Sequence, residues 1–155
     1  VFFRLKKTGT LNTSYGAIND ELLLFPEINL QNLRKSIINI RRKKLPEPSE
    51  LGNAGSFFKN PVVSKRKAEE LKEQYRDMPI YPDGDKIKLA AGWLIDKCGC
   101  KEISYGDAGV HKDQALVLVN YGRASGSEII YLSEKIKETV YQSFGVELET
   151  EVNIL

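Results

Sequence analysis

The sequence has little of the residues that build metal and redox sites. It contains one histidine, His111, and two cysteines, Cys98 and Cys100, with a single residue between them. One histidine cannot form a site with several histidine ligands, and this cysteine spacing is neither a C-x-x-C motif nor well suited to a disulfide. We therefore predict no bound metal and two structural thiols in a reducing compartment.

Net charge and long apolar runs are equally scarce. The 155 residues carry 23 basic and 21 acidic side chains, so the net charge is +2. This balance gives no indication of binding to nucleic acid or to a membrane. Without a signal peptide or an apolar run long enough to cross a bilayer, the sequence predicts a cytoplasmic protein.

Both ends of the chain are apolar, whereas natural termini are usually polar and frayed. The sequence begins VFF, without a methionine, and closes on VNIL. We expect strands over 1–5 and 152–155. If two strands are interrupted within their apolar parts, we expect the sequence to be a piece of a longer protein.

Helices are indicated by apolar spacing and by their end signals. Leucines and isoleucines recur at helical spacing between 30 and 40, with Asn29 as N-cap and Pro46 beyond the end. The basic run 41–44 suits the C-terminal end of this helix, and its simplest interpretation is a solvated helix end. Further helices are expected after Ser64, over 90–98, and from the S-x-x-E capping box at Ser125 to Gly145.

Short strand candidates alternate irregularly with these helices. They cover 87–89, 103–105, 116–119 and 146–148, and the sequence at 81–84 has the chemistry of a turn. This order favours an α+β fold over a doubly wound sheet. We predict a two-layer domain of short, mostly antiparallel strands packed with helices.

The segment 52–61 combines two glycines, a serine and two adjacent phenylalanines. Glycine lets the backbone approach a ligand closely, so Ser56 could be presented beside a substrate. Composition alone favours a glycine turn that leads into a core strand. Phe58 stands where a G-x-S-x-G motif needs glycine, and no clear base accompanies the serine. The pattern therefore points to an acid or a hydrogen-bonding group rather than to a nucleophile.

The segment GNAGSFFKNPVV, at 52–63, resembles the signature of the UDP-N-acetylenolpyruvoylglucosamine reductases. Five further segments fit that family in its order and approximate spacing, so the resemblance covers essentially the whole chain. They are SYGAI at 14–18, IRRKKLPEP at 40–48, AAGWLID at 90–96, HKDQALVLVN at 111–120 and LETEV at 148–152.

The resemblance implies an NADPH- and FAD-dependent oxidoreductase of peptidoglycan precursor synthesis. In that family NADPH reduces the flavin, which gives a hydride to C3 of the enolpyruvyl group, and a proton arrives at C2 to yield UDP-N-acetylmuramate. The site must stabilise the developing enolate with acidic or positive groups. By the same resemblance Ser56 is the acid at C2, Glu151 stabilises the enolate, and Lys44 is a lysine of the site.

Strand periodicity alone does not show whether Glu149 or Glu151 is the catalytic carboxyl, since residues two positions apart on a strand face the same side. The family's carboxyl immediately precedes a valine, which selects Glu151. Without the resemblance, Glu151 would be interpreted as a solvent-facing charge on a strand, and Lys44 would be interpreted as part of the solvated helix end.

The resemblance also implies contacts to the UDP-sugar from Asn60, Tyr81 and Gln114. Tyr15 matches the tyrosine of a loop that closes over the diphosphate in one subclass. The plain alternatives are a turn residue at Asn60, an aromatic side chain before proline at Tyr81, and a surface amide at Gln114. His111 and the tryptophan of AAGWLID are expected to be structural.

The domain organisation follows from the same resemblance. Residues 1–42 would be the tail of a flavin-binding domain with a linker helix, 43–150 the substrate-binding domain, and 151–155 the start of a strand that returns to the flavin domain. The flavin-binding loops would precede Val1, so the isolated chain should neither bind flavin nor turn over. Two other classes stay open: a non-catalytic nucleotide-sugar binding module, and a structural or interaction domain.

Overall fold

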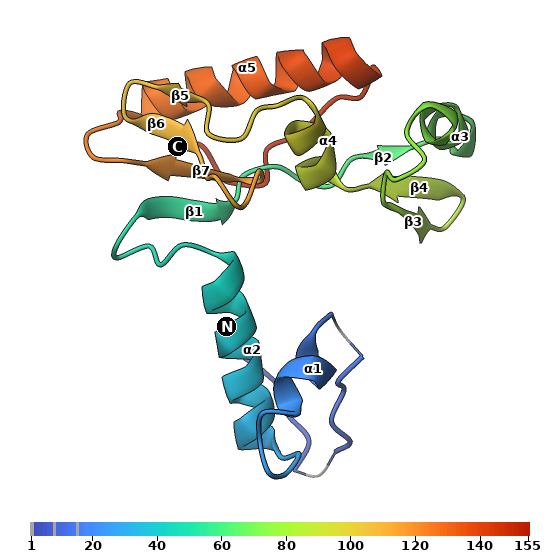
Figure 1. Ribbon diagram of the computed structural model, residues 1–155, viewed down its shortest axis with the longest axis vertical. Coiled ribbons are helices and arrows are strands. Elements are labelled where there is room, and N and C mark those ends of the chain that lie inside the picture. The colour runs from blue at the N-terminus through green and yellow to red at the C-terminus, as the bar shows by residue number, and fades with distance from the viewer. Residues whose placement is uncertain (1, 8, 15) are drawn as a thin grey trace. The chain divides into compact units, whose positions relative to one another are not determined.

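The computed structural model describes residues 2–7, 9–14 and 16–155. The chain divides into two compact units, Val1–Lys44 and Leu45–Leu155 (Figure 1). The first unit pairs a short helix, α1 (Ile18–Leu22), with a long one, α2 (Leu30–Lys44). Apolar side chains of α1 are buried in this contact, which explains why so short a helix is stable.

The predicted N-cap of α2 is confirmed, because the Asn29 side-chain oxygen accepts a hydrogen bond from the Asn32 backbone N–H at 2.8 Å. The strand expected over 1–5 is wrong for its described part. Residues 2–5 are irregular, and Phe2, Phe3 and Leu5 are exposed. A strand needs a hydrogen-bonding neighbour, and no strand is paired with this segment in the described ranges.

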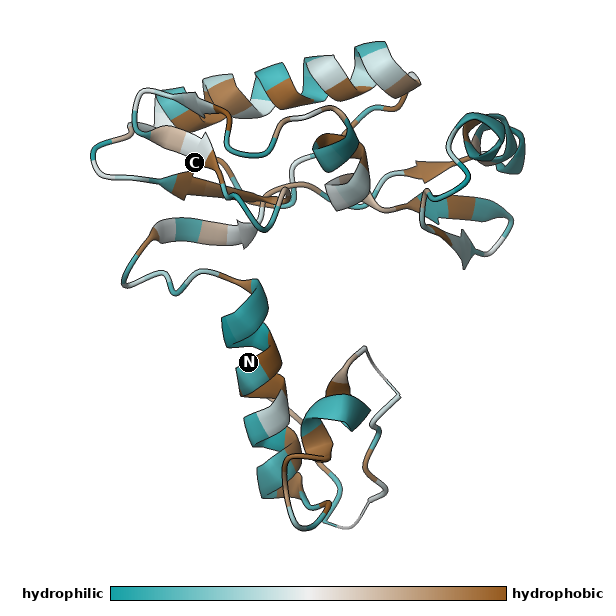
Figure 2. Cartoon of the chain, viewed as in Figure 1, coloured by the Kyte–Doolittle hydropathy of each residue, from teal (hydrophilic) through white to brown (hydrophobic). Residues whose placement is uncertain are grey.

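A four-stranded antiparallel sheet and one long helix form the larger part of the second unit. The strand order is β1 (Gly52–Ser56), β7 (Val117–Asn120), β6 (Ala108–Val110) and β5 (Ser104–Tyr105). Helix α5 (Gly126–Phe144) packs across β5, β6 and β7 (Figure 1). Strand β7 is apolar along most of its length (Figure 2), as suits a central strand buried on both faces.

The second unit also holds a three-stranded antiparallel sheet. Its order is β2 (Val62–Val63), β4 (Lys86–Leu89) and β3 (Ile80–Asp83). Helix α3 (Lys65–Gln74) contacts β4, and α4 (Ala91–Lys97) packs against α5. Every strand pair among the described residues is antiparallel, and the predicted α+β class is confirmed.

The turn expected over 81–84 lies further along the chain. Strand β3 continues to Asp83, and the chain reverses at Gly84, whose φ is +63°. Pro82 is tolerated in the strand because β3 is the edge of its sheet.

One core joins the layers of the second unit. The largest side chains that are fully buried there include Phe58, Leu89, Leu94, Ile136 and Val140. At its border the rings of Tyr75, Trp93 and Phe144 pack on one another with centroids 5.2–6.0 Å apart, so the structural role expected for Trp93 is confirmed.

Helix α5 begins and ends with the predicted signals. Ser125 and Glu128 form the capping box, and Gly145 follows the helix with a φ of +59°. In the part of the chain that the structure describes, no helix has both the length and the apolar content needed to cross a bilayer.

Candidate functional site

Ser56 stands at the end of a bulged strand. Strand β1 pairs Asn53 with Val119 and Ser56 with Val117, so three steps on β1 match two on β7. The extra residue is accommodated at Gly55, whose φ is +74°. A Cβ on Gly55 would meet nothing within 4 Å, so glycine is required here for its backbone conformation and not for space.

The side chain of Asn53 holds this bulge. Its oxygen accepts a hydrogen bond from the Gly55 N–H at 3.0 Å, and its amide donates to the carbonyls of Leu51 and Pro46 at 2.8 and 3.2 Å. Sequence reasoning did not single out Asn53. The available signal was an asparagine two residues before a glycine, which is typical of a side-chain-closed turn.

Phe57 connects the strand that carries Ser56 to the last segment of the chain. Its N–H donates to the Leu116 carbonyl at 2.7 Å, and its carbonyl accepts from the Glu151 N–H at 2.8 Å. An isolated antiparallel bridge joins Phe58 to Thr150 beside it. Glu151, which lies far from Ser56 in the sequence, is thus hydrogen-bonded through its backbone to the residue that follows Ser56.

The same pairing distinguishes Glu149 from Glu151. Exposed and more buried residues alternate from 146 to 152, and both glutamates lie on the exposed side. The strands expected over 146–148 and 152–155 are nevertheless wrong, because this segment forms only the isolated bridge at Thr150. Lys59 forms an ion pair with Glu149 at 3.1 Å, with both side chains more than half exposed. Within the described ranges the side chain of Glu151 has no hydrogen-bond or ion-pair partner, so its carboxylate is available to a ligand.

Asn60 has a structural contact of its own. Its side-chain oxygen accepts a hydrogen bond from the backbone N–H of Ala91, the first residue of α4, at 2.9 Å. It also lines a hollow of about 600 Å³. The walls of that hollow are residues 59–63, Tyr141, 145–147 and Glu149.

Gln114 lies in the loop between β6 and β7, half-buried. It lines a second hollow, of about 200 Å³, together with Trp93, Asp96 and Lys101. Lys101 and Asp96 form an ion pair at 2.8 Å. The sequence analysis did not single out Lys101, because no motif surrounds it. In the same loop His111 accepts a hydrogen bond through Nδ1 from the Asp113 N–H at 3.2 Å, which fits the structural role expected for it.

The remaining predicted residues lie on other elements or outside the described residues. Tyr81 lies on β3, opposite Lys88 in the three-stranded sheet, and is about half exposed. Lys44 is the exposed last residue of α2 in the first unit. Tyr15 lies outside the described residues.

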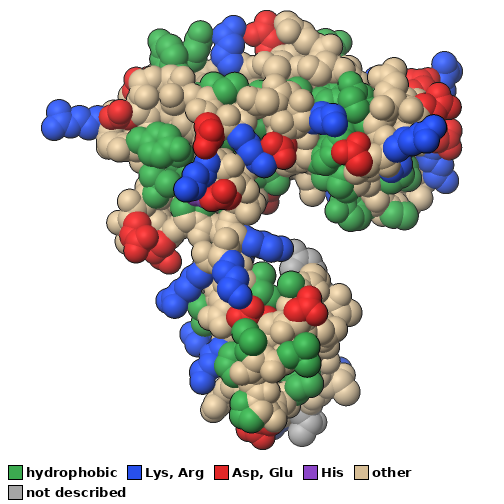
Figure 3. Space-filling model, in the orientation of Figure 1, with side chains coloured by type: hydrophobic (Ala, Val, Ile, Leu, Met, Phe, Trp, Pro, Cys, Tyr) green, Lys and Arg blue, Asp and Glu red, His purple; other side chains and the backbone are tan. Residues whose placement is uncertain are grey.

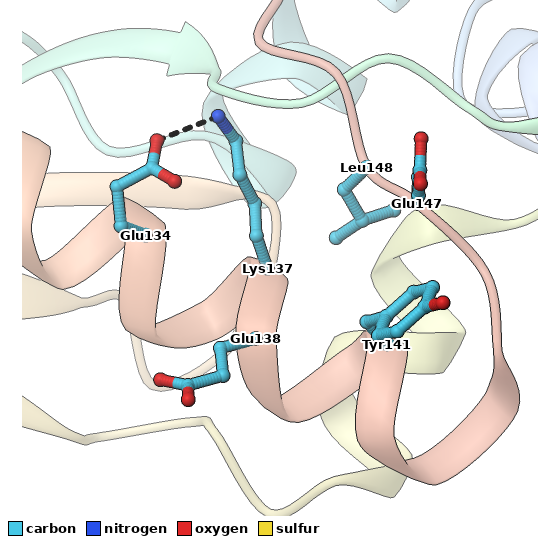
Figure 4. A pocket seen from close by; sticks show the side chains of 6 residues that line it. All are labelled: Glu134, Lys137, Glu138, Tyr141, Glu147 and Leu148. Atoms are coloured by element: carbon cyan, nitrogen blue, oxygen red, sulfur yellow. Dashed lines mark hydrogen bonds and ion pairs between the residues drawn. The ribbon is translucent and has the colours of Figure 1, made fainter.

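A third hollow, of about 360 Å³, lies between α5 and the segment that follows it (Figure 4). Its wall includes Tyr141, Glu147, and the ion pair of Lys137 with Glu134 at 2.7 Å. None of the residues that line it was a predicted site residue. In the described part of the chain no three His, Cys, Asp or Glu side chains gather as metal ligands would.

Comparison with known proteins gives one consistent result. Residues 47–155 match the family model described as "UDP-N-acetylenolpyruvoylglucosamine reductase, C-terminal domain". Proteins of that name from Flavobacterium johnsoniae and Chromobacterium violaceum are 45% and 50% identical to the chain. The matches cover 100% of this chain and 47% and 46% of those proteins. The chain therefore spans about half the length of the curated relatives it matches.

A solved structure is also similar, the crystal structure of UDP-N-acetylenolpyruvylglucosamine reductase from Thermus caldophilus. It is 26% identical, with a TM-score of 0.47, and the match covers 79% of this chain and 34% of that one.

Proposed function

The chain belongs to the UDP-N-acetylenolpyruvoylglucosamine reductase family, and on this premise we propose that it supplies the substrate side of a reductase site. The full-length enzyme would reduce UDP-N-acetylenolpyruvoylglucosamine to UDP-N-acetylmuramate with NADPH. This reaction would serve peptidoglycan precursor synthesis, and with it cell shape and division, in the cytoplasm.

The observation that supports the proposal is the backbone contact at Phe57, whose carbonyl accepts a hydrogen bond from the Glu151 N–H one residue after Ser56. A hydride to C3 of the enolpyruvyl group leaves negative charge that spreads from C2 onto the substrate carboxylate. Ser56 would deliver the proton to C2, and the carboxyl group of Glu151 would donate a hydrogen bond that stabilises the enolate before that proton arrives. A serine hydroxyl is a weak acid, but the carbanion is a strong base, so the transfer is favourable when the alkoxide is quickly reprotonated.

FAD, reduced by NADPH, would supply the hydride. We assign no residue of this chain to the FAD pyrophosphate. Pyrophosphates are commonly held by glycine-rich turns that open a helix, whereas the glycine segment here is a bulged strand with backbone groups that bond to β7 and Asn53. The flavin-binding loops are therefore expected elsewhere in the full-length enzyme.

Substrate binding would involve Tyr15, Lys44, Asn60, Tyr81 and Gln114. A neutral sugar and a uracil suit amide and phenol groups, and a diphosphate suits an ammonium group. NADPH must reach the same flavin and would share the phosphate contacts.

We also propose the domain organisation that the sequence predicts. Residues 1–42 belong to the tail of the flavin-binding domain and a linker helix, 43–150 to the substrate-binding domain, and 151–155 to a strand that returns to the flavin domain. The division into two units after Lys44 supports the first boundary, since it differs from it by two residues.

The test is stopped-flow kinetics on the full-length enzyme with Ser56→Ala. Flavin reduction by NADPH should persist, and reoxidation by the enolpyruvyl substrate should slow by about 10²–10⁴-fold, the usual effect of a lost general acid. Ser104→Ala, at an exposed serine of the same sheet, is the matched control and should leave both steps intact. Equal slowing of both steps by Ser56→Ala would assign Ser56 to folding or binding. Unchanged reoxidation would show that Ser56 is not the general acid.

A further inference from the structure

Glu21 is a buried carboxylate that the proposed reaction does not use. Its side chain is 8% exposed, and both of its oxygens are engaged. One accepts a hydrogen bond from Lys43 Nζ at 2.7 Å, and the other accepts from the Asn39 amide at 2.9 Å. The bond from Lys43, followed by the bond from Asn39, lowers the pKa of Glu21, so it is ionised at neutral pH.

These contacts lie on one face of α2. Asn39 and Lys43 are four residues apart, so their side chains stand above one another on the helix. Glu21 reaches them from α1 and fixes that short helix on the last turns of α2. A carboxylate that is buried without partners is costly, so the position of α1 depends on this pairing.

Lys44 follows Lys43 directly but is rotated by about 100° around the helix axis, away from the face that Glu21 covers. It is exposed, and no described residue forms an ion pair with it. Lysine and arginine side chains gather at this end of α2 (Figure 3). Of the two adjacent ammonium groups, one is therefore neutralised within the unit and the other is free for an anionic ligand.

We propose that Glu21 is a positioning residue of the substrate site. By binding Lys43 and holding α1 on α2, it sets Lys44 as the ammonium group that meets the diphosphate of the ligand. The inference rests on the proposed function, because it takes the diphosphate of the UDP-sugar as the ligand of Lys44.

Steady-state kinetics and thermal melting of the full-length enzyme test this role. Glu21→Gln should raise the KM for the UDP-sugar about tenfold and leave kcat within about twofold, because the ligand contacts are displaced while the chemistry is unchanged. Asp20→Asn removes the same charge from an exposed neighbour on α1 and should change neither quantity. The charge-swapped double variant Glu21→Lys/Lys43→Glu should return KM to near the wild-type value.

A merely structural role predicts a different pattern. If Glu21→Gln lowers the Tm with KM unchanged, or lowers kcat as much as it raises KM, the proposal is overturned. If Glu21→Gln does not fold, a folded charge-swapped variant with a raised KM overturns it equally. The variant Lys44→Met tests the diphosphate contact of Lys44 separately from the positioning role of Glu21.

If Lys44→Met leaves KM unchanged, the assignment of Lys44 in the proposed function is wrong. If Lys44→Met raises KM while Glu21→Gln has a normal KM, only the positioning role of Glu21 is wrong.

Discussion

The backbone N–H of Glu151 donates a hydrogen bond to the carbonyl oxygen of Phe57 at 2.8 Å, one residue after Ser56. This bond fixes the register of the last segment against the strand that carries the candidate acid. A slip of two residues would put Glu149 in the place of Glu151, and the ion pair of Glu149 with Lys59 favours the observed register. The pairing therefore gives the two glutamates different surroundings, because Glu149 has an ion-pair partner and Glu151 has none among the described residues.

We expect the two glutamates to differ in their effect on catalysis. In the full-length enzyme Glu151→Gln should slow enolpyruvyl reduction by about 10²–10³-fold, as the loss of a group that stabilises developing charge usually does, and should spare flavin reduction by NADPH. Glu149→Gln is the matched control and should do little, since an exposed ion pair contributes about 0–1 kcal/mol. Separate stopped-flow measurements of the two half-reactions decide the matter. A larger effect at Glu149 would shift the assignment by two residues.

Asn60 can be tested for binding apart from its structural contact. Asn60→Asp keeps an oxygen for the Ala91 N–H but replaces the amide donor with a negative charge, so it should weaken UDP binding about tenfold or more by repelling the diphosphate. Asn60→Ala leaves the Ala91 N–H without its partner and should also destabilise the protein by about 1–3 kcal/mol. Calorimetric titration with UDP and thermal melting of the full-length enzyme separate the effects. Wild-type affinity in Asn60→Asp would leave Asn60 with its structural contact only.

The capping box of α5 should contribute measurably to stability. Ser125 Oγ accepts from the Glu128 N–H, and the Glu128 carboxylate accepts from the Ser125 N–H at 2.7 Å. Ser125→Ala should lower the free energy of unfolding by about 1 kcal/mol, measured by urea denaturation, while Ser127→Ala at the neighbouring exposed position should change it little.

The same cap should respond to pH in one direction. The backbone N–H of Ser125, together with its hydroxyl, lowers the pKa of Glu128. The stabilisation is therefore complete above the usual glutamate pKa and is lost as pH falls through the lowered folded-state value. The test is Glu128→Ala, which removes the carboxylate: an effect of Glu128→Ala on stability that stays equally large well below that value would contradict this account.

The two cysteines should react at different rates. Burial, and then the charge of Cys98, raises the pKa of Cys100 to about 11, so almost none of it is thiolate at pH 8, whereas Cys98 is only partly buried. Iodoacetamide should therefore modify Cys98 first, which mass spectrometry of the Cys98→Ala and Cys100→Ala variants would resolve. Comparable labelling of both variants in the folded state would be the opposite result, and in denaturant the two should become equal.

Helix ends were predictable because their signals are local. Asn29, Ser64 and Ser125 each cap the helix that the sequence predicts. Helix α1 was missed because its N-cap residue, Ala17, makes no side-chain cap, and because its stability comes from α2. Strand β6 is three residues long and owes its existence to neighbours on both sides, which no local pattern indicates.

The site was predictable to a different degree at each residue. Ser56 stands in an unusual segment, but the bulge that presents it depends on the pairing with β7. Glu151 carries no local signal at all, and only the family resemblance selects it. The ion pair between Glu21 and Lys43 joins residues 22 positions apart, so it could be identified only from the structure.

The pairing at Phe57 also has a consequence for how the chain folds. Lys59 and Glu149, which close the same pairing, are 90 residues apart in the sequence. Contacts between residues this far apart carry a large loop-closure entropy cost. They therefore form late, after helices and hairpins have formed between near neighbours. We therefore expect far-ultraviolet circular dichroism to recover before Glu151 reaches Ser56 during refolding. The candidate catalytic pair would then be among the last features of the domain to form.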